Sequence, residues 1–484
     1  LWRDVLGAPV DDEQADFFAL GGGSLQAAQL VAAVRQRYPQ TTVAQLYDRP
    51  RLGSLAGFLD DMGRSDPGAE ATSRTVEPTP WQTQAAQVLL SVPLATLTGL
   101  QWVTWLALIN NAVAAVHPVG WLVRLDWWWV IAAFVLFVTP LGRMGIAALG
   151  ARALLSKLQP GTYRRGGPEH LRVWIAERLA TASGVPEVDL TGHWIDGDAF
   201  HVGPVTVGND ATIGARTTLL PGAAVGKDAD VAPGSGVVGE VKKGQYWTGS
   251  PAVKSGKAHH PWPEHRPPPR PVWAAVYGLT SLLLAGLPLL AVGAGLAVLG
   301  WAVRDCATLT EAIRPAVLAT PPAALVAMFS YAALTVIGVR LLSIGLRDGY
   351  HPVRSRVGWQ LWATERLMDA ARDYLFPVYA SLITPWWLRL LGAKVGSGTE
   401  ISTALVIPKF TTIADGAFLA DDTMVASYEL GGGWIHVAPA TIGKRAFLGN
   451  SGITQPGRRV PDNSLVAVLS TAPHKAKTGS SWLG

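Results

Sequence analysis

Ser24 lies in a setting typical of a serine that another protein modifies. It follows three glycines at 21–23 and precedes a stretch in which Ala27, Leu30 and Val34 recur at helical spacing, which predicts an amphipathic helix. A hydroxyl group at a helix start is accessible, and the backbone N–H groups there favour a bound phosphate. We therefore expect Ser24 to carry a phosphate-linked group; the alternative is an N-cap serine after a flexible turn.

A second group of side chains that could do chemistry lies in residues 191–202. His193, Asp196, Asp198 and His201 fall in this loop-like segment, which interrupts a regular six-residue repeat. Functional residues tend to lie in such excursions from a rigid scaffold. Either histidine could act as a general base, and either carboxylate could orient a histidine or bind a cation. The alternative for each histidine is a hydrogen-bonded residue at a coil corner.

A related segment lies further along the chain, where His436–Gly443 aligns with His201–Gly208. His436 thus occupies the position of His201. The pairs that differ are His193 with Tyr428 and Trp194 with Glu429. The two copies are therefore chemically unequal. Either one is catalytic and the other structural, or they build one site across an interface.

The elements that must position these side chains have a period of six residues. Aliphatic residues fall on every sixth position, namely Val207, Ile213, Leu219, Val225, Val231 and Val237 in the first copy and Ile442, Leu448, Val460 and Val466 in the second. One buried aliphatic in every six residues predicts a parallel β-helix of the hexapeptide type, with three short strands per coil. A β-meander would alternate with a period of two instead.

The repeated unit is larger than the β-helix. Trp174-Ile-Ala-Glu-Arg-Leu179 aligns with Trp362-Ala-Thr-Glu-Arg-Leu367, so an amphipathic helix precedes the β-helix in both copies. We expect these helices to pack on the bilayer interface. Because the helix motif and the β-helix lie further apart in the second copy, that copy carries an insertion at roughly 375–421. We predict that an equivalent stretch is missing from the first copy between Ser183 and Pro186.

The rest of the chain has the composition of a membrane protein. Of its 484 residues, 49% are hydrophobic and 15% charged, and long stretches contain no Asp, Glu, Lys or Arg. Several of these stretches exceed the ~20 residues that a helix needs to cross a bilayer. We predict four spans in two pairs, at about 87–109, 120–141, 273–296 and 316–339.

Basic residues predict the orientation of these spans. Arginines and lysines follow the second span, precede the third and follow the fourth, whereas the loops on the other side hold few. The positive-inside rule therefore places the N-terminal domain and both β-helices in the cytoplasm. The net charge of +5 is mostly a topology signal, and nucleic acid is not an expected partner. Cys306 is the only cysteine, so we expect no disulfide and no metal site.

These patterns predict a multidomain protein with an all-α four-helix domain, paired transmembrane helices and tandem left-handed parallel β-helices. The expected segments are the helical domain at 1–62, a flexible linker at 63–84, the first two spans at 85–150, an interfacial helix at 151–185, the first β-helix at 186–258, a Pro-rich spacer at 259–271, the last two spans at 272–340, a second interfacial helix at 341–375 and the second β-helix at 376–484.

Parts of the chain resemble known families. Asp16–Leu25, which contains Ser24, and Gln45–Leu55 resemble the 4′-phosphopantetheine attachment site and the closing helices of peptidyl carrier domains. Hexapeptide β-helices commonly serve in acyltransferases, whose donor lies between neighbouring β-helices. The whole layout is similar to that of the ε-poly-L-lysine synthetases, which are membrane-bound nonribosomal peptide synthetases. That resemblance runs through Asp16–Leu25, Val188–Lys254 and Ala404–Gly484.

The resemblance implies iterative formation of isopeptide bonds in the bacterial cytoplasmic membrane. A lysyl group held as a thioester on 4′-phosphopantetheine at Ser24 would pass to the amine of free lysine or of a growing cationic oligomer. The family also implies an upstream adenylation domain, which uses ATP, and a third tandem unit. Because Leu1 falls inside the expected first helix, we expect the adenylation domain upstream in the same longer polypeptide, and the symmetry of the fold suggests the third unit beyond Gly484. Self-association is left open.

In that chemistry the acceptor amine must lose a proton, because the reference pKa of lysine is about 10.4. The candidate catalytic residues are His193, His201, His436 and Asp196, and the candidates for binding an ammonium group are Asp198 and Glu429. His193 is favoured over His201, because a residue shared by both copies can be kept for folding. One alternative is another diamino acid, such as diaminobutyrate. A second is that the β-helices are a non-catalytic scaffold or export collar.

Overall fold

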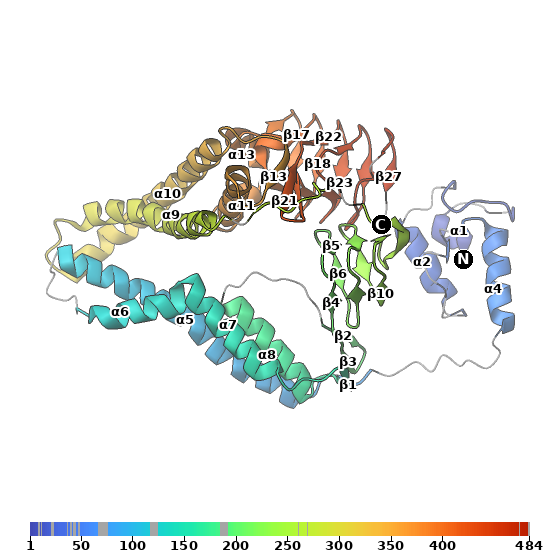
Figure 1. Cartoon of the computed structure of the whole chain (residues 1–484), viewed down its shortest axis with the longest axis horizontal. Helices are drawn as coiled ribbons and strands as arrows, with labels where there is room; N and C mark the ends of the chain where they lie inside the picture. Colours follow the sequence, from blue (N-terminus) through green and yellow to red (C-terminus); the bar gives the residue numbers. More distant parts are fainter. Residues whose placement is uncertain are drawn as a thin grey trace. The chain divides into compact units, whose positions relative to one another are not determined.

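A computed structural model describes the chain apart from residues 8, 9, 11, 21–23, 36, 39, 40, 42–44, 47, 48, 66–75, 117–123, 184–191, 260, 269, 474, 483 and 484. The described residues form two compact units, Leu1–Pro78 and Thr79–Gly484. Figure 1 labels their helices and strands.

The first unit is a small helical domain with its own core. Its helices include α1 (Trp2–Leu6), α2 (Ser24–Val34) and α4 (Leu52–Ser65). The apolar stripe predicted for α2 is buried against Phe17 and Leu46, both of which are fully enclosed. The Trp2 ring packs edge-on against Phe17 with ring centres 5.2 Å apart. Part of the segment in which a fourth helix is expected lies outside the described residues.

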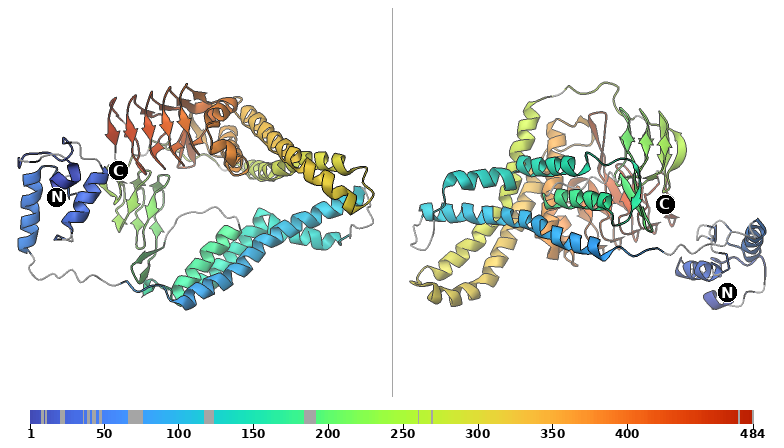
Figure 2. Two further views of the ribbon diagram at one scale, coloured as in Figure 1. Left: turned by 180° about the vertical axis from the view of Figure 1, so that it is seen from behind. Right: turned by 90° about the horizontal axis from the view of Figure 1, so that it is seen from below.

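Three described helices of the second unit are long and apolar enough to cross a membrane. They are α5 (Trp81–Val116), α9 (Val272–Val303) and α10 (Leu309–Leu342). A fourth span would come from a bent pair of segments, α6 (Trp127–Ala133) with η1 (Phe134–Val138), followed by α7 (Pro140–Leu155). Figure 2 shows α9 and α10 side by side.

The bend of 61° between these segments has a local cause. Thr139 precedes Pro140, and a residue before proline is driven out of the helical conformation. Thr139 is accordingly extended, with φ −68° and ψ 146°, and its side chain accepts a hydrogen bond from the Gly142 N–H as an N-cap. The helix therefore breaks close to the expected end of the predicted second span at 120–141.

Both predicted β-helices are present. The strands of the first are β4 (Thr206–Val207), β5 (Thr212–Ile213), β6 (Thr218–Leu219), β7 (Ala224–Val225), β8 (Asp230–Val231), β9 (Gly236–Val237), β10 (Glu240–Val241), β11 (Gln245–Thr248) and β12 (Val253–Lys257). Those of the second are β14 (Lys394–Val395), β15 (Glu400–Ile401), β16 (Leu405–Val406), β17 (Thr411–Ile413), β18 (Phe418–Leu419), β19 (Met424–Val425), β22 (Ala440–Ile442), β23 (Phe447–Leu448), β24 (Ile453–Thr454), β25 (Arg459–Val460), β26 (Leu465–Val466) and β27 (Ser481–Trp482).

The strands pair in parallel from one coil to the next and form three walls. In the first β-helix the walls are β4-β7-β10, β5-β8-β11 and β6-β9. Strand β12 extends the β5-β8-β11 wall by pairing antiparallel with β11. The repeat glycines permit this stacking. A Cβ atom on Gly226 would lie 2.7 Å from the backbone nitrogen of Lys243 in the next coil, and one on Gly443 would lie 2.6 Å from that of Asp462.

Each β-helix carries a three-stranded antiparallel excursion, which in the first copy takes two of its strands from the segment 191–202 that was expected to be a loop. In the first copy it consists of β1 (Gly161–Arg164), β2 (His193–Asp196) and β3 (Ala199–Val202). In the second it consists of β13 (Gly349–Pro352), β20 (Tyr428–Gly431) and β21 (Trp434–Val437). The expectation of a loop was wrong, because these segments pair with a strand that lies before the amphipathic helix.

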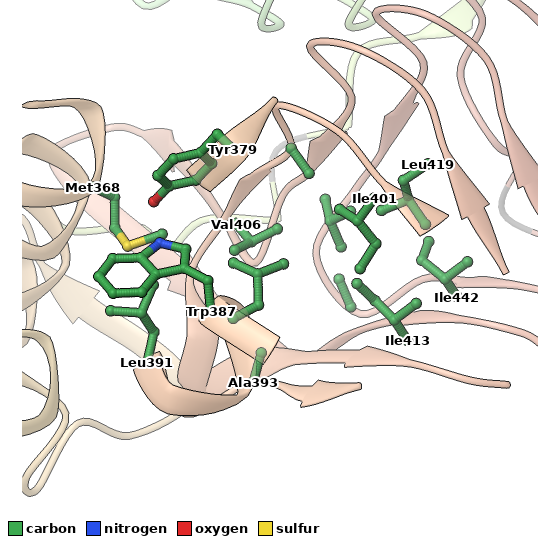
Figure 3. Packing of buried hydrophobic residues seen from close by; sticks show 14 of the residues in the cluster. Met368, Tyr379, Trp387, Leu391, Ala393, Ile401, Val406, Ile413, Leu419 and Ile442 are labelled. Atoms are coloured by element: carbon green, nitrogen blue, oxygen red, sulfur yellow. The ribbon is translucent and has the colours of Figure 1, made fainter. Parts of the chain in front are cut away.

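The two amphipathic helices are α8 (Pro168–Ala182) and α11 (Arg356–Tyr374). The expected interfacial position does not describe α11, whose Leu361, Ala363 and Leu367 are buried in protein. One core joins α11 to α9, α10 and the interior of the second β-helix. Figure 3 shows this core, with Met368 at one end and Ile442 among the stacked aliphatics.

The additional residues of the second copy form α12 (Phe376–Tyr379), α13 (Thr384–Leu391) and the first coils of its β-helix. The predicted missing stretch of the first copy adjoins residues 184–191, which lie outside the described residues.

Candidate active site at the junction of the two β-helices

A cavity of about 400 Å³ lies where the two β-helices meet. The first β-helix contributes lining residues at β5 and β8, and the second copy contributes α11, β16, β19 and β20. The lining includes Ile213, Gly214, Asp230, Val231 and Pro233 from the first copy, Trp262 from the spacer, and Glu365, Met368, Asp369, Arg372, Val406, Met424, Ser427, Tyr428 and Glu429 from the second. The two copies therefore build one cavity together.

Direct contacts hold the two β-helices beside this cavity. Arg216 of the first ion-pairs with Asp422 of the second at 2.8 Å. The Thr471 hydroxyl donates a hydrogen bond to the Pro233 carbonyl oxygen at 3.3 Å. Pro233 itself lines the cavity, so this wall is tied to the partner β-helix.

Strand β20 places different chemistry on its two faces. Successive side chains of a strand point to opposite sides, so Tyr428 and Glu429 diverge although both residues line the cavity. The Tyr428 side chain meets α11, whereas the Glu429 side chain meets His436 on β21. Tyr428 and Glu429 therefore have different polar neighbours, Glu365 on α11 and His436 on β21, and of these two neighbours only Glu365 is itself among the described lining residues.

The region beside α11 contains Glu365. The Tyr428 hydroxyl donates a hydrogen bond to Glu365 Oε2 at 2.8 Å. Burial raises the pKa of Glu365, and burial together with the Glu365 carboxyl raises the pKa of Tyr428, so the tyrosine stays a hydrogen-bond donor. Asp369, one turn further along α11, ion-pairs with Arg366 at 2.8 Å and with Arg372 at 2.6 Å.

The region on the other face of β20 contains a histidine–carboxylate pair. His436 Nδ1 lies 3.0 Å from Glu429 Oε1, and the two residues are opposite each other in the β20–β21 register. The His436 ring stacks on Tyr350 of β13, with ring centres 4.5 Å apart and an interplanar angle of 18°. The pair is partly exposed, at 23% for the histidine and 43% for the glutamate. A histidine oriented by a carboxylate can act as a general base.

Apolar and neutral polar groups complete the lining. Met368, Val406 and Met424 supply apolar surface, and the buried hydroxyl of Ser427 has no hydrogen-bond partner among the described residues. Carboxyl groups beside such a surface suit a cation on a methylene chain. The arrangement can therefore bind an aminoalkyl group and remove a proton from an amine.

The structure places the candidates of the first copy elsewhere. His193 lies on β2, 3.5 Å from Glu177 Oε1 and against the Phe200 ring. On the adjacent β3, His201 Nδ1 lies 2.9 Å from the Thr162 hydroxyl. Asp196 ends β2, and Asp198 lies in the turn to β3. Of the candidates, only Glu429 is among the described cavity-lining residues, and His436 contacts it.

Sequence reasoning missed Glu365, Asp369, Arg372, Asp230 and the role of Tyr428. A usable signal existed for one of them. Glu365 lies in the helix motif that the two copies share, where its counterpart is Glu177. A charged residue in a repeated apolar motif could have been tested as a site residue. Asp230 gives no such signal, because it occupies an ordinary coil position.

Comparisons with known proteins find one match confined to the N-terminal unit and another that extends over nearly the whole chain. Residues 1–59 match the family profile described as "Phosphopantetheine attachment site". Over 97% of its length, the chain is 24% identical to the Delta-poly-L-ornithine synthetase of Acinetobacter baumannii (strain AB307-0294), of which it covers 40%. A stretch of 61 residues, 12% of the chain, is 49% identical to the Nonribosomal peptide synthetase asaC of Aspergillus flavus and covers 6% of it.

Among solved structures, the soybean serine acetyltransferase apoenzyme matches 40% of this chain and 64% of that chain, at 12% identity and a TM-score of 0.16. The β-helices are defined by the parallel pairing of their own strands from one coil to the next.

The first unit is thus a carrier domain with a phosphopantetheine attachment site, and the predicted covalent 4′-phosphopantetheine is confirmed. The predicted resemblance to the poly-amino-acid synthetases is also confirmed. The chain spans two fifths of the length of the poly-ornithine synthetase that it matches.

Proposed function

We propose that this chain forms amide bonds between an aminoacyl group on its carrier domain and an amine bound in the cavity between its β-helices. The observation that supports this most is the composition of the cavity. Its walls come from both β-helices, and its lining combines at least four carboxyl groups with apolar side chains. A carrier domain in the same chain supplies the activated acyl group.

The carrier fits its prosthetic group at Ser24. This serine is the first residue of α2, an eleven-residue helix with no acidic residue in its first turn. The helix dipole and the free N–H groups there favour a phosphodiester. When bound, 4′-phosphopantetheine supplies a thiol that holds an acyl group as a thioester.

His436 and Glu429 carry the proposed proton transfer. Glu429 attracts the acceptor ammonium and orients His436, which takes a proton from the nitrogen. The prosthetic group would supply the acyl carbon that the nitrogen attacks and a thiol as the leaving group. Of the two protons that an ammonium loses in becoming an amide N–H, His436 would pass one to the leaving sulfur, and the other would go to water. A positioned base contributes about 10²- to 10⁴-fold in rate.

The hairpin of the first copy is the alternative location of this chemistry. There His193 or His201 would be the base, with Asp196 to orient it and Asp198 to bind the ammonium. The contact of His193 with Glu177 at 3.5 Å gives that histidine a carboxylate partner. None of these four side chains is among the described residues that line the cavity between the β-helices.

The proposed substrate is a diamino acid. Lysine is our first choice from the family resemblance, and the product is then an isopeptide-linked oligolysine. The name of the poly-ornithine synthetase points to ornithine for that relative. Diaminobutyrate is a shorter alternative.

The proposed setting is the bacterial cytoplasmic membrane, with several spans and with the carrier and β-helices on the cytoplasmic side. Support comes from the three long apolar helices and from the basic loops. The proposed partners are the lipid bilayer, the cationic oligomer, an adenylation domain that consumes ATP and a third tandem unit. Self-association of the chain is a further proposal of this kind.

A reconstituted assay tests the function. Protein in nanodiscs is loaded with lysine on Ser24 chemoenzymatically, free lysine is added, and products are followed by mass spectrometry. We expect oligolysine from the wild type and a loss of about 10²- to 10⁴-fold in His436→Ala, with smaller effects in His193→Ala and His201→Ala. Equal product from all three variants would refute a catalytic β-helix and support the scaffold alternative.

A further inference from the structure

One contact recurs at equivalent positions in both copies. Glu177 of α8 approaches His193 at the start of β2, and Glu365 of α11 accepts a hydrogen bond from Tyr428 at the start of β20. The two glutamates occupy the same position of the repeated helix motif, and their partners occupy the same position of the aligned hairpins. The fold thus brings a helix carboxyl to the same place in each hairpin, and only the partner differs.

The surroundings of this contact differ between the copies. Glu177 is 56% exposed, and it is not among the described residues that line the cavity. Glu365 does line the cavity, and its side chain is 37% exposed. The second copy therefore presents its helix carboxyl to a bound molecule.

Glu365 is also distinguished by its neighbours. Asp369 is held by two arginines, and Glu429 is held by His436. The nearest partner of Glu365 is instead a neutral hydroxyl at 2.8 Å, and its ion pair with Arg366 is longer, at 3.7 Å. The charged or titratable groups around it are Arg366, Asp369 and Arg372 on α11, Tyr428 and Glu429 on β20, and Asp230 on β8 across the cavity. The described lining holds four carboxyls and one guanidinium, so the site attracts a cation.

We propose that Glu365, positioned by Tyr428, binds the non-reacting α-ammonium group of the acceptor amino acid and so directs its side-chain amine toward Glu429 and His436. This inference rests on the proposed function and adds the residues that select the side-chain amine. A diamino acid has two amines that could attack. Glu365 and Glu429 both line the cavity, only Glu429 contacts a histidine, and the apolar lining suits the methylene chain that joins the two amines.

The raised pKa of Glu365 is consistent with this assignment. Burial raises it because the negative charge is poorly solvated. An ammonium group in contact with the carboxylate would offset that penalty. The contacts of Tyr428 and Arg366 with this carboxyl both involve Oε2, so Oε1 is assigned to the ligand.

The test compares two acceptors that differ in one group. Lysine and 6-aminohexanoate share the side-chain amine, the methylene chain and the carboxylate, but only lysine has an α-ammonium group. Single-turnover transfer from the lysyl-loaded carrier is measured as a function of acceptor concentration. For the wild type we expect a KM for lysine about 10- to 100-fold below that for 6-aminohexanoate, the range of a charged hydrogen bond.

Two variants locate this preference. Glu365→Gln keeps the shape and the acceptor for Tyr428, and it should raise the KM for lysine toward that for 6-aminohexanoate while kcat changes little. Tyr428→Phe should reduce the same preference without abolishing it. Glu400→Gln, an exposed carboxyl on β15 outside the cavity lining, is the matched control and should retain the wild-type ratio.

The outcomes separate the two proposals. Product from the wild type with equal KM values for both acceptors, or an unchanged preference in Glu365→Gln, would overturn the role of Glu365 and leave the proposed function standing. Absence of product from the wild type with either acceptor would overturn the proposed function, and the subsite with it. A preference lost only in Glu365→Gln and weakened in Tyr428→Phe would establish the subsite.

Discussion

Gly214→Ala should damage the first β-helix and the cavity together. Gly214 lines the cavity, and a Cβ atom at this position would lie 2.6 Å from Pro233 Cα in the next coil. Ordinary contacts between such atoms are about 3.5–4.0 Å, so the coils must separate by about 1 Å or more. The contact is with backbone, and no side-chain rotation relieves it. Overpacking of this kind costs about 1–3 kcal/mol.

Hydrogen exchange measured by mass spectrometry on the protein in nanodiscs tests this magnitude. A local loss of about 1–3 kcal/mol predicts amide exchange roughly 5- to 100-fold faster in peptides from β5 and β8. Gly256→Ala is the matched control, because a Cβ atom there meets nothing within 4 Å. Equal protection of these strands in the two variants would refute the account of coil stacking. Normal exchange with lost amide formation would refute only the link between stability and the cavity.

Three shorter predictions follow from other contacts. His170 Nδ1 accepts a hydrogen bond from the Gly166 N–H. Burial lowers the pKa of His170, and the nearby Arg165 and His193 lower it further. The neutral histidine therefore stabilises the fold above about pH 6.5, and this stabilisation is lost as the pH falls through the folded-state pKa. His170→Asn should flatten this acid dependence in thermal-unfolding scans. Arg216→Ala should lower stability by less than about 1 kcal/mol in the same scans, because its partner Asp422 is mostly exposed. Ser24→Ala should prevent the mass increase that coenzyme A and a phosphopantetheinyl transferase produce.

The β-helices were predictable because their signal is local and repeated. A single coil position, such as Val225 or Ile442, reports its burial through residue type alone, and the six-residue spacing excludes a meander. The parallel partner of each strand then follows from the length of one coil. Val225 pairs with Val207, 18 residues before it, as one coil of three hexapeptides requires. Its partner on the other side, Val241, is 16 residues further on, because the last coil is two residues shorter.

Other parts of the fold depend on partners that the sequence does not reveal. The amphipathic pattern of α11 shows that one face is apolar, but it does not distinguish a bilayer from a protein core. The hairpins were missed because four-residue strands such as β2 and β20 are too short for a clear alternation. The third strand of each sheet, β1 or β13, pairs with β3 or β21 and lies before the amphipathic helix, far away in the sequence.

The cavity is the feature that was hardest to predict from the sequence. Its first wall is built from regular coil residues, such as Gly214 and Asp230, whose types follow the repeat and carry no separate signal. They acquire a chemical role only because the second copy packs against them. Glu429 was identified because it departs from the aligned Trp194, which shows that differences between copies are more informative here than shared residues.

The duplication therefore explains why two similar units need not do the same work. At the positions of Asp369 and Glu429, the first copy has Thr181 and Trp194, so its helix and its hairpin each lack one of the carboxyls that line the cavity. Its β-helix meanwhile supplies the opposite wall of that cavity. A unit that serves as a wall is selected for the shape of its coil surface, whereas a unit that carries the site is selected for its side chains. The asymmetry in charge follows from this division, and it favours the second copy as the place where the amine is bound and deprotonated.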